Sequence, residues 1–470
     1  MKKIIIIISL LFVFFTEAAY AVSVKIGVID TGIKEKEGIF GSEKILSGQN
    51  YVLGNDNTDD EVGHGTRIAS LIIGTDDGEI VSPCKESFIV PLVYYTKLAS
   101  GAVLNGGIDA ICNAIYDAVY VYGCRIINIS SGITADDERL EKAVRYAEEK
   151  GVLVVSACGN SGDEVYYPAA YDKVIGVGSH NNAFEPADFS CKGSGLDVLM
   201  YGEDLKVVSI KNTADYELIS GTSYSTALIT AHAASALEQY PYLTPSQIRY
   251  LMRTSCDDIC DGGYDEKSGY GVFNPERFYE NLRLFDHGEI VCFYDVEKDD
   301  WYYDSVSKAY HQGWMNGTGD GLFDPDGNMT RVMFVTILYR AEGQPQTNDI
   351  LKFDDVAENA YYAEAVSWAS ENGIIAGVSD TEFVPDKNIT REEMAAVMSR
   401  YADYKDINTN SQGDLTIFTD ASTVSGWARE YMNWAVGTGL ISGKGDNMLD
   451  PLGSATRAEA AAILQRFLEK

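Results

Sequence analysis

Three short stretches rich in small residues place an acid, a base and a nucleophile along this chain. They are Val28-Ile-Asp30-Thr-Gly32, Gly63-His64-Gly-Thr66 and Gly221-Thr-Ser223. Acyl transfer by serine uses these groups, because serine attacks, histidine takes its proton and the carboxylate orients the imidazole. The order Asp, His, Ser also differs from the His, Asp, Ser and Ser, Asp, His orders of other folds. The stretches therefore predict that Asp30, His64 and Ser223 meet at one catalytic site.

Each stretch alone has an ordinary structural explanation. Asp30 follows an apolar run and could form only a turn, and Ser223 precedes a run of small residues and could be only a helix N-cap. His64 lies between two glycines, which permit a close backbone approach that a packed structural histidine seldom needs. A fourth stretch ends an apolar run in Gly159-Asn160, which is a turn or an oxyanion donor. The combination of all four favours the catalytic interpretation.

Apolar and amphipathic runs alternate over the first 275 residues. Apolar runs predict strands at residues 24–29, 88–94, 125–129, 152–157 and 173–178. Longer runs predict helices at about residues 64–74, 105–122, 136–150, 223–239 and 245–255. This alternation predicts an α/β fold with a doubly wound, mostly parallel sheet that helices cover on both faces. Active sites of such sheets lie outside the carboxyl ends of the strands, where Asp30 and Asn160 fall.

The four motifs resemble those of the subtilisin-like serine proteases, or subtilases, over about residues 22–275. The resemblance implies a subtilisin-like sheet and a covalent acyl-enzyme intermediate. It implies that the Asn160 side chain and the Ser223 backbone N–H donate hydrogen bonds to the oxyanion. It also implies that Ser130, Ser131 and Gly132 pair with the substrate backbone as an added strand.

Tyr166 stands roughly where many subtilases have a glycine at the base of the primary specificity pocket. A tyrosine there would fill the pocket and favour small residues before the scissile bond. Near the nucleophile, Ser225 replaces a common alanine and Ala227 replaces a usual proline, so the entry of the helix is expected to differ.

The segment from His64 to Pro83 looks shorter than in calcium-stabilised subtilases. Nearby acidic residues could bind a cation, but a solvated loop is the favoured interpretation; these are Asp56, Asp59, Asp60 and Glu61. No cofactor is needed for the chemistry, a structural calcium ion is left open without being favoured, and the metal ligands are unknown.

Residues 1–21 have the pattern of a secretory signal peptide: Met1-Lys-Lys3, an apolar run over 4–15 and Ala19-Tyr-Ala21. The mature chain would begin about eight residues before Asp30, which leaves no room for a propeptide. No other segment suggests a transmembrane span. A net charge of −33 argues against a nucleic-acid partner. Eight cysteines leave the disulfide state open and show no paired zinc spacing.

The C-terminal part contains three similar segments, which begin at Phe293, Phe353 and Phe418. From each phenylalanine, the same residue types recur at offsets that agree to within one residue. They are an aromatic (Trp301, Tyr361, Trp427), a glycine (Gly317, Gly377, Gly443), a proline (Pro325, Pro385, Pro451) and the arginine of a Thr-Arg pair (Arg331, Arg391, Arg457). Each segment predicts a helix, a glycine-rich loop, a proline turn and a second helix.

The Thr-Arg pair predicts how each second helix begins. Thr390 with Glu393 and Thr456 with Glu459 fit the capping box. The first segment has Met333 at the glutamate position, so its cap is predicted to be weaker.

The three segments resemble S-layer homology modules, which hold proteins on Gram-positive-type cell envelopes. The resemblance implies a mainly helical domain that binds an anionic wall polysaccharide. Arginines suit carboxylates and tryptophans suit sugar faces, which makes Arg331, Arg391, Arg457, Trp301 and Trp427 the candidate contacts. Alternatively, these arginines pair only with neighbouring carboxylates and the tryptophans are core residues.

The predicted organisation is a signal peptide (1–21), a catalytic domain (22–285), a linker (286–292) and three repeats (293–343, 353–404 and 418–470). We expect a secreted serine endopeptidase that acts on protein or peptide substrates and is held at the cell wall, or S-layer, of a Gram-positive-type bacterium. Two alternatives are a dedicated processing protease for an exported peptide and a non-catalytic envelope protein on a subtilase scaffold. The intact acid, base, nucleophile and asparagine favour an enzyme.

Overall fold

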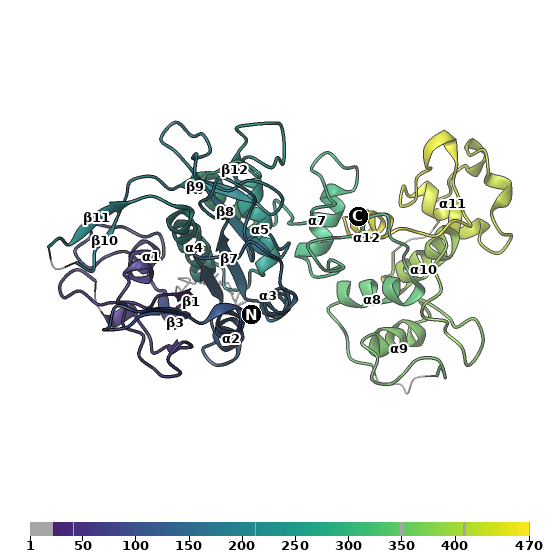
Figure 1. Cartoon of the computed structure of the whole chain (residues 1–470). Helices are drawn as coiled ribbons and strands as arrows, with labels where there is room; N and C mark the ends of the chain where they lie inside the picture. Colours follow the sequence, from purple (N-terminus) through teal and green to yellow (C-terminus); the bar gives the residue numbers. More distant parts are fainter. Residues whose placement is uncertain (1–21, 41, 212, 348–351, 408–409, 470) are drawn as a thin grey trace, which may run out of the picture. The chain divides into compact units, whose positions relative to one another are not determined.

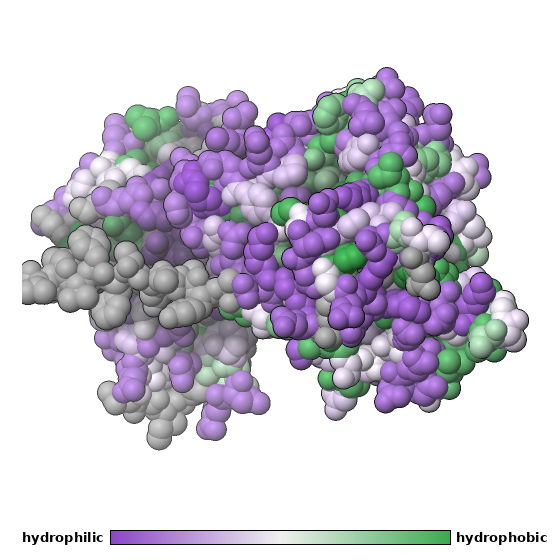
Figure 2. Space-filling model, turned by 90° about the vertical axis from the view of Figure 1, so that its left-hand side faces the viewer, coloured by the Kyte–Doolittle hydropathy of each residue, from purple (hydrophilic) through white to green (hydrophobic). Residues whose placement is uncertain are grey.

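The computed structural model describes residues 22–40, 42–211, 213–347, 352–407 and 410–469 (Figure 1). The predicted signal peptide lies outside the described residues. The chain divides into two compact units, one ending at Leu282 and one from Arg283 to Lys470. On the face in Figure 2, hydrophilic residues surround scattered hydrophobic ones, as the high net charge leads one to expect.

The first unit is built on a nine-stranded sheet of order β12-β13-β9-β8-β7-β6-β1-β3-β2. Its central strands are parallel and are buried on both faces, which explains their continuous apolar sequences. They are β1 (Lys25–Asp30), β3 (Phe88–Val93), β6 (Ile126–Ile129), β7 (Leu153–Ala157) and β8 (Val174–His180). All five predicted strands are confirmed, with ends shifted by only one or two residues.

The other strands are two to four residues long. In the large sheet these are β2 (Gln49–Asn50), β9 (Val198–Tyr201), β12 (Cys256–Asp257) and β13 (Val272–Phe273). Two hairpins lie outside that sheet, β4 (Tyr95–Lys97) with β5 (Val103–Asn105) and β10 (Leu205–Val208) with β11 (Tyr216–Ile219).

Helices cover both faces of the sheet. The helices α2 and α3 pack on one face, and α1 and α4 pack on the other. The bounds are α1 (His64–Ile73), α2 (Gly107–Tyr120), α3 (Glu138–Glu149), α4 (Thr222–Gln239) and α5 (Pro245–Thr254). These match the five predicted helices, and α6 (Pro275–Asp286) and the 3₁₀ turn η1 (Ser42–Lys44) were not predicted. The predicted α/β fold class is confirmed.

The second unit contains two α-helices per repeat. They are α7 (Tyr303–His311) and α8 (Arg331–Ala341), α9 (Ala363–Glu371) and α10 (Arg391–Tyr404), and α11 (Arg429–Gly437) and α12 (Arg457–Leu468). Short 3₁₀ turns η2 (Leu415–Ile417), η3 (Ala421–Thr423) and η4 (Gly445–Asn447) occur in the third repeat. Thr390 and Thr456 form complete capping boxes, whereas Thr330 accepts one bond, from the backbone of Met333. The predicted difference between the caps is confirmed.

The three repeats close into a ring. The N–H of Ile389 donates to the carbonyl of Met329, that of Ala455 to Ile389, and that of Met329 to Ala455, at N···O distances of 2.8 to 2.9 Å. Each repeat therefore pairs with both of the others through equivalent backbone bonds.

Two residues of the predicted linker, 286–292, are buried. Val291 belongs to the apolar core of the second unit, and Cys292 is buried as well. All eight cysteines lie within the described residues and are free thiols, and Cys260 is the exposed one among them.

Candidate functional site

Asp30 and His64 are in direct contact at the carboxyl edge of the sheet. Asp30 is the last residue of β1, and His64 is the first residue of α1. The Nδ1 atom of His64 lies 2.8 Å from Oδ1 and 2.9 Å from Oδ2 of Asp30. Burial lowers the pKa of His64, but the charge and hydrogen bond of Asp30 outweigh it and place this pKa above its ordinary value. The pair has the geometry of a base held by a carboxylate.

The glycines on either side of His64 are required by space and by backbone conformation. Gly63 has a φ of 93°, in the left-handed region. A Cβ on Gly65 would lie 2.2 Å from the carbonyl oxygen of Gly32, so no larger residue fits there. The Gly-His-Gly pattern thus lets the first turn of α1 approach the end of β1.

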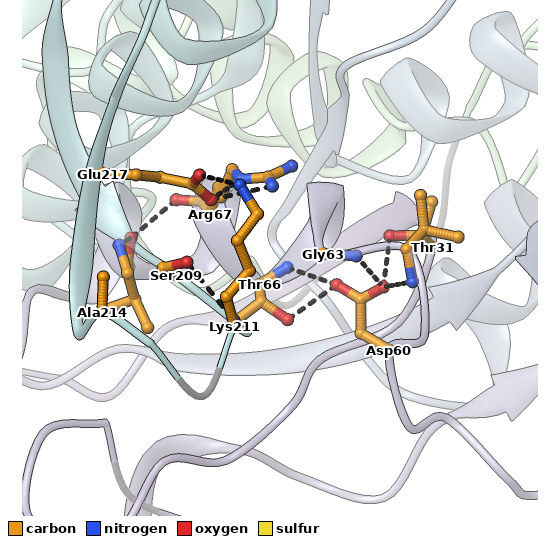
Figure 3. Close-up of polar contacts among 12 residues, drawn as sticks. Thr31, Asp60, Gly63, Thr66, Arg67, Ser209, Lys211, Ala214 and Glu217 are labelled. Carbon is orange, nitrogen blue, oxygen red and sulfur yellow. Dashed lines mark hydrogen bonds and ion pairs between the residues drawn. The ribbon is translucent and has the colours of Figure 1, made fainter.

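Asp60 is a fully buried carboxylate next to this turn (Figure 3). Its two oxygens accept hydrogen bonds from the backbone N–H groups of Val62, Gly63 and Thr66 and from the hydroxyls of Thr31 and Thr66, at 2.7 to 3.0 Å. The expectation of a solvated loop is therefore wrong for Asp60, because five donors from the chain replace its water.

Ser223 lies in the first turn of α4 and is buried. Its hydroxyl donates to the carbonyl oxygen of Ser130 at 3.0 Å, and among the described contacts this carbonyl, not His64, is its partner. The adjacent Tyr224 packs against His64, with 5.8 Å between the two ring centroids. The structure thus brings Ser223 to the same edge of the sheet as Asp30 and His64.

Asn160 follows β7 through Gly159 and is exposed. Its Oδ1 accepts from the backbone N–H of Thr222 at 2.9 Å and from the hydroxyl of Thr222 at 3.0 Å. Its Nδ2 lies 3.5 Å from the position that a Cβ on Gly221 would occupy. The side-chain donor of Asn160 therefore faces the turn that carries Ser223.

The segment Ser130–Gly132 follows β6 directly and is connected to Ser223 by a chain of buried hydrogen bonds. Thr230 donates to Asn128, the amide of Asn128 donates to the Ser130 hydroxyl, and that hydroxyl donates to the carbonyl of Ser223 at 3.1 Å. Sequence reasoning placed Asn128 in the same motif as Ser130 but did not predict its hydrogen bonds or its partner Thr230. The signal was present, because asparagine is unfavourable inside an apolar strand.

Tyr166 lies between the segment after β6 and the loop after β7. A Cβ on Gly132 would lie 2.8 Å from the Cβ of Tyr166, and one on Gly159 would lie 3.0 Å from its Cγ. The side chain is partly buried and packs against Cys158 and Cys191. The tyrosine therefore occupies the space between these two segments.

The two residues near Ser223 that differ from the common subtilase pattern, Ser225 and Ala227, fit within α4. The Ser225 hydroxyl donates to the carbonyls of Met200 and Tyr201 at 3.0 and 3.1 Å. Ala227 is buried, and α4 runs through it without interruption.

The three repeat arginines are buried, and each one donates hydrogen bonds to a neighbouring repeat. Arg331 donates to the carbonyls of Phe383 and Ala376, Arg391 to those of Leu449 and Ser442, and Arg457 to those of Phe323 and Asn316. Arg391 also pairs with Glu459. Sequence reasoning missed this role, since the acceptors are backbone carbonyls.

Trp301 and Trp427 are 64 % and 54 % exposed, so they are not core residues. A cavity of about 460 Å³ lies within the second unit. Its lining includes one candidate tryptophan, one candidate arginine and further charged residues: Trp301, Arg391, Lys444, Glu459 and Arg466. Arg331, Arg457 and Trp427 are not part of this lining.

Among the described residues, no group of three or more His, Cys, Asp or Glu side chains is arranged to hold a metal ion. The oxygens of Asp60 are used by donors from the chain, so the acidic stretch does not fit a calcium site through this residue. Nor does any helix in the described ranges have the length and hydropathy needed to cross a membrane.

Comparison with known proteins identifies both units. The family described as the subtilase family matches residues 22–271, more than half of the chain. The S-layer homology domain matches residues 293–331, 352–395 and 417–461.

Two relatives in sequence agree with these matches, Subtilisin DY with the first and a surface-layer protein with the second. Subtilisin DY from Bacillus licheniformis is 30% identical over 262 residues, which cover 54% of this chain and 90% of that protein. The surface-layer 125 kDa protein of Lysinibacillus sphaericus is 34% identical over 169 residues, which cover 35% of this chain and 14% of that protein. The crystal structure of fervidolysin from Fervidobacterium pennivorans has a TM-score of 0.49 and 26% identity, and the match covers 56% of this chain and 43% of that chain.

The S-layer homology repeats indicate association with the cell surface. The chain belongs to the subtilase family of serine endopeptidases, and three S-layer homology repeats follow its protease domain.

Proposed function

We propose that this chain is a secreted endopeptidase that works through Asp30, His64 and Ser223 while its repeats hold it at the cell wall. The observation that carries the catalytic part is the contact of both carboxylate oxygens of Asp30 with Nδ1 of His64. This contact fixes the imidazole with Nε2 as the proton acceptor.

In the proposed reaction, the Ser223 hydroxyl turns from the carbonyl of Ser130 to Nε2 of His64. His64 takes the proton while the serine oxygen attacks the scissile carbonyl carbon. Asp30 stabilises the imidazolium, which then protonates the leaving amine. Water hydrolyses the resulting acyl-enzyme with His64 again acting as base.

The negative oxygen of the tetrahedral intermediate needs two donors. We assign these to Nδ2 of Asn160 and the backbone N–H of Ser223. The supporting observation is that Thr222 donates two hydrogen bonds to Oδ1 of Asn160. These bonds orient the amide so that Nδ2 faces the turn at Gly221. The N-terminus of α4 adds favourable potential at the same place.

The catalytic proposal is tested with the full chain and its Ser223→Ala variant. Both are incubated with a fluorophosphonate, which labels activated serines, and both are assayed with casein. Labelling and casein hydrolysis by the wild type alone are expected. A folded wild-type protein that takes no label would instead favour a non-catalytic envelope scaffold.

Tyr166 supports a narrower substrate class. Its ring fills the space beside Gly132 and Gly159, where the side chain before the scissile bond would lie. We propose that Ser130, Ser131 and Gly132 pair with the substrate backbone and that Tyr166 restricts the preceding side chain to small residues. This observation also favours the second candidate, a dedicated protease that processes an exported peptide.

The anchoring proposal rests on the cavity in the second unit. Trp301 offers an exposed ring to a sugar face, and Arg466 offers positive charge to an anionic polysaccharide, together with Lys444, which pairs with Asp450 and Glu459. Arg391 lines the same cavity while it holds the third repeat.

Anchoring is tested with the catalytically silent Ser223→Ala chain on purified cell wall. Binding is expected to be lost when the anionic polymer is stripped from the wall, and to fall in the Trp301→Ala variant. The Trp427→Ala variant reports whether a second surface contributes. Undiminished binding to stripped wall would overturn the proposal.

A further inference from the structure

An ion pair joins the helix that carries His64 to the strand that leads to Ser223 (Figure 3). Arg67 lies three residues after His64 on α1, and Glu217 lies on β11, six residues before Ser223. Both Nε and a terminal nitrogen of Arg67 lie 2.8 Å from Oε1 of Glu217. The two side chains are only 15 % and 19 % exposed, so water screens them less than it screens a surface pair.

Glu217 is ionised within this network. Burial raises its pKa, but Lys211, at 2.9 Å from Oε2, and Arg67 together bring it below the ordinary value. Lys211 is 63 % exposed, so Arg67 is the enclosed partner.

The hairpin that carries Glu217 is itself fastened to the protein. Lys36 donates to the carbonyls of Ser209 and Ala214, in the loop between β10 and β11, at 3.1 and 2.7 Å. The N–H of Val208 donates to the Ser70 hydroxyl on α1 at 3.3 Å. Glu217 thus presents a fixed anion to Arg67.

The guanidinium of Arg67 also borders the catalytic groups. One terminal nitrogen lies 3.4 Å from the position of a Cβ on Gly63, the residue before His64. Its positive charge acts on buried Tyr224, the neighbour of Ser223, whose pKa burial raises to about 12. Tyr224 in turn packs against His64.

We propose that Arg67, held by Glu217, is a positioning residue that sets the orientation and charge of His64 relative to Ser223. This proposal rests on the catalytic function proposed above. The pair fixes the first turn of α1 against β11, and Tyr224, which interacts with Arg67, packs against the imidazole.

Several charged or titratable groups face His64 from the elements packed around it. They are Asp30 on β1, Asp60 before α1, Arg67 on α1 and Tyr224 on α4, with Glu217 on β11 behind Arg67. Asp30 and Asp60 raise the pKa of His64, and Arg67 lowers it. Arg67 therefore offsets part of the carboxylate field and extends the activity of the neutral base to lower pH.

The test compares Arg67→Gln and Glu217→Gln in the full chain. The readout is the acid limb of the pH profile of kcat/KM, together with the pH dependence of fluorophosphonate labelling. Loss of Arg67 removes the positive charge that lowers the pKa of His64, while Glu217 keeps Lys211 as its partner, and is expected to move the limb to higher pH by roughly half a unit or more. Loss of the Glu217 charge leaves Arg67 unopposed and is expected to move the limb to lower pH.

The opposite directions separate this role from a merely structural one. A structural ion pair would lower the unfolding midpoint in both variants without moving the limb in opposite directions. Arg67→Lys keeps the charge but not the two-nitrogen contact, so the limb is expected to stay in place while kcat falls. Arg139→Gln, which removes the ion pairs that the exposed Arg139 of α3 forms with Asp109 and Asp137, is the matched control and is expected to match the wild type.

Two failures are distinguishable. A wild-type chain that neither labels nor hydrolyses would overturn the catalytic proposal itself. An active wild type whose acid limb is unchanged in both variants, or shifts in the same direction in both, would overturn the role of Arg67 alone.

Discussion

Arg457, at the start of the last helix, donates from Nε to the carbonyl of Phe323 in the first repeat at 2.8 Å. A second nitrogen of the same guanidinium reaches the carbonyl of Asn316 at 2.7 Å. The end of the repeat domain is thus attached to its beginning, although the residues are more than 130 positions apart in sequence.

Replacing Arg457 with alanine is expected to destabilise the second unit by about 2–4 kcal/mol, because a buried side chain is removed and the carbonyls of Phe323 and Asn316 lose their donors. All five tryptophans lie in this unit, so tryptophan fluorescence during urea unfolding reports on it alone. Arg429→Ala, at an exposed position of the third repeat, is the control and is expected to have little effect. If Arg457→Ala were as stable as Arg429→Ala, the role of Arg457 in stabilising the second unit would be contradicted.

Asn160→Asp is expected to lower kcat by roughly 10²–10³ with little change in KM, because the variant loses the Nδ2 donor. The substitution keeps an oxygen that can accept from Thr222, so the turn before Ser223 is retained. Steady-state kinetics on one peptide substrate measure the effect. A similar fall in Asn160→Ala would assign the loss to the missing donor, whereas full activity in the aspartate variant would exclude that assignment.

Tyr166→Gly is expected to widen the specificity of the enzyme. The wild type should cleave after alanine or glycine, and the variant should gain cleavage after leucine and phenylalanine because the ring no longer fills the space beside Gly159. Profiling with a peptide library checks this, with the rate after alanine as the internal reference. Efficient wild-type cleavage after phenylalanine would refute the prediction.

His232 makes the stability of the first unit depend on pH. It lies partly buried on α4, shares a hydrogen bond of 3.0 Å with the Tyr279 hydroxyl, and has a pKa that desolvation lowers to about 4. The unfolded chain binds this proton near pH 6.5 and the folded chain only near pH 4. The stability that neutral His232 contributes to the first unit is therefore fully present above pH 6.5 and is lost as the pH falls toward 4.

The measurement is urea unfolding at pH 7 and pH 4.5, followed by circular dichroism in the Ser223→Ala background to prevent self-digestion. His232→Phe is expected to lose less stability on acidification than the parent. His287→Asn, at an exposed position, is expected to behave as the parent does. An unchanged acid response in His232→Phe would show that other groups govern it.

The central strands were predictable because burial on both faces demands continuous apolar runs, as in β1 and β7. The hairpin of β10 and β11 was not predictable from the sequence. Its strands have four residues each and are partly exposed, so their apolar and polar residues show no clear alternation. The motifs around Asp30, His64 and Ser223 could be recognised in the sequence because each contains small residues, which allow backbone segments to approach one another closely.

Other parts of the site could not be inferred from local sequence. Asp60 looks like one more acid in an acidic loop, and its burial depends on donors such as Thr31, which is 29 residues away. Arg67 and Glu217 are 150 residues apart, and nothing local marks them as partners. Long-range pairs of this kind become visible only when the fold brings their elements together.

The circular hydrogen bonding of Met329, Ile389 and Ala455 has a consequence for how the repeat number can change. A linear array that loses its end repeat loses one junction, whereas this circle would lose two of its three and leave the surviving pair open. Addition of a fourth copy would likewise require every angle between neighbours to change. The number three is thus a property of the geometry, and a truncation by one copy should behave as the loss of the whole module.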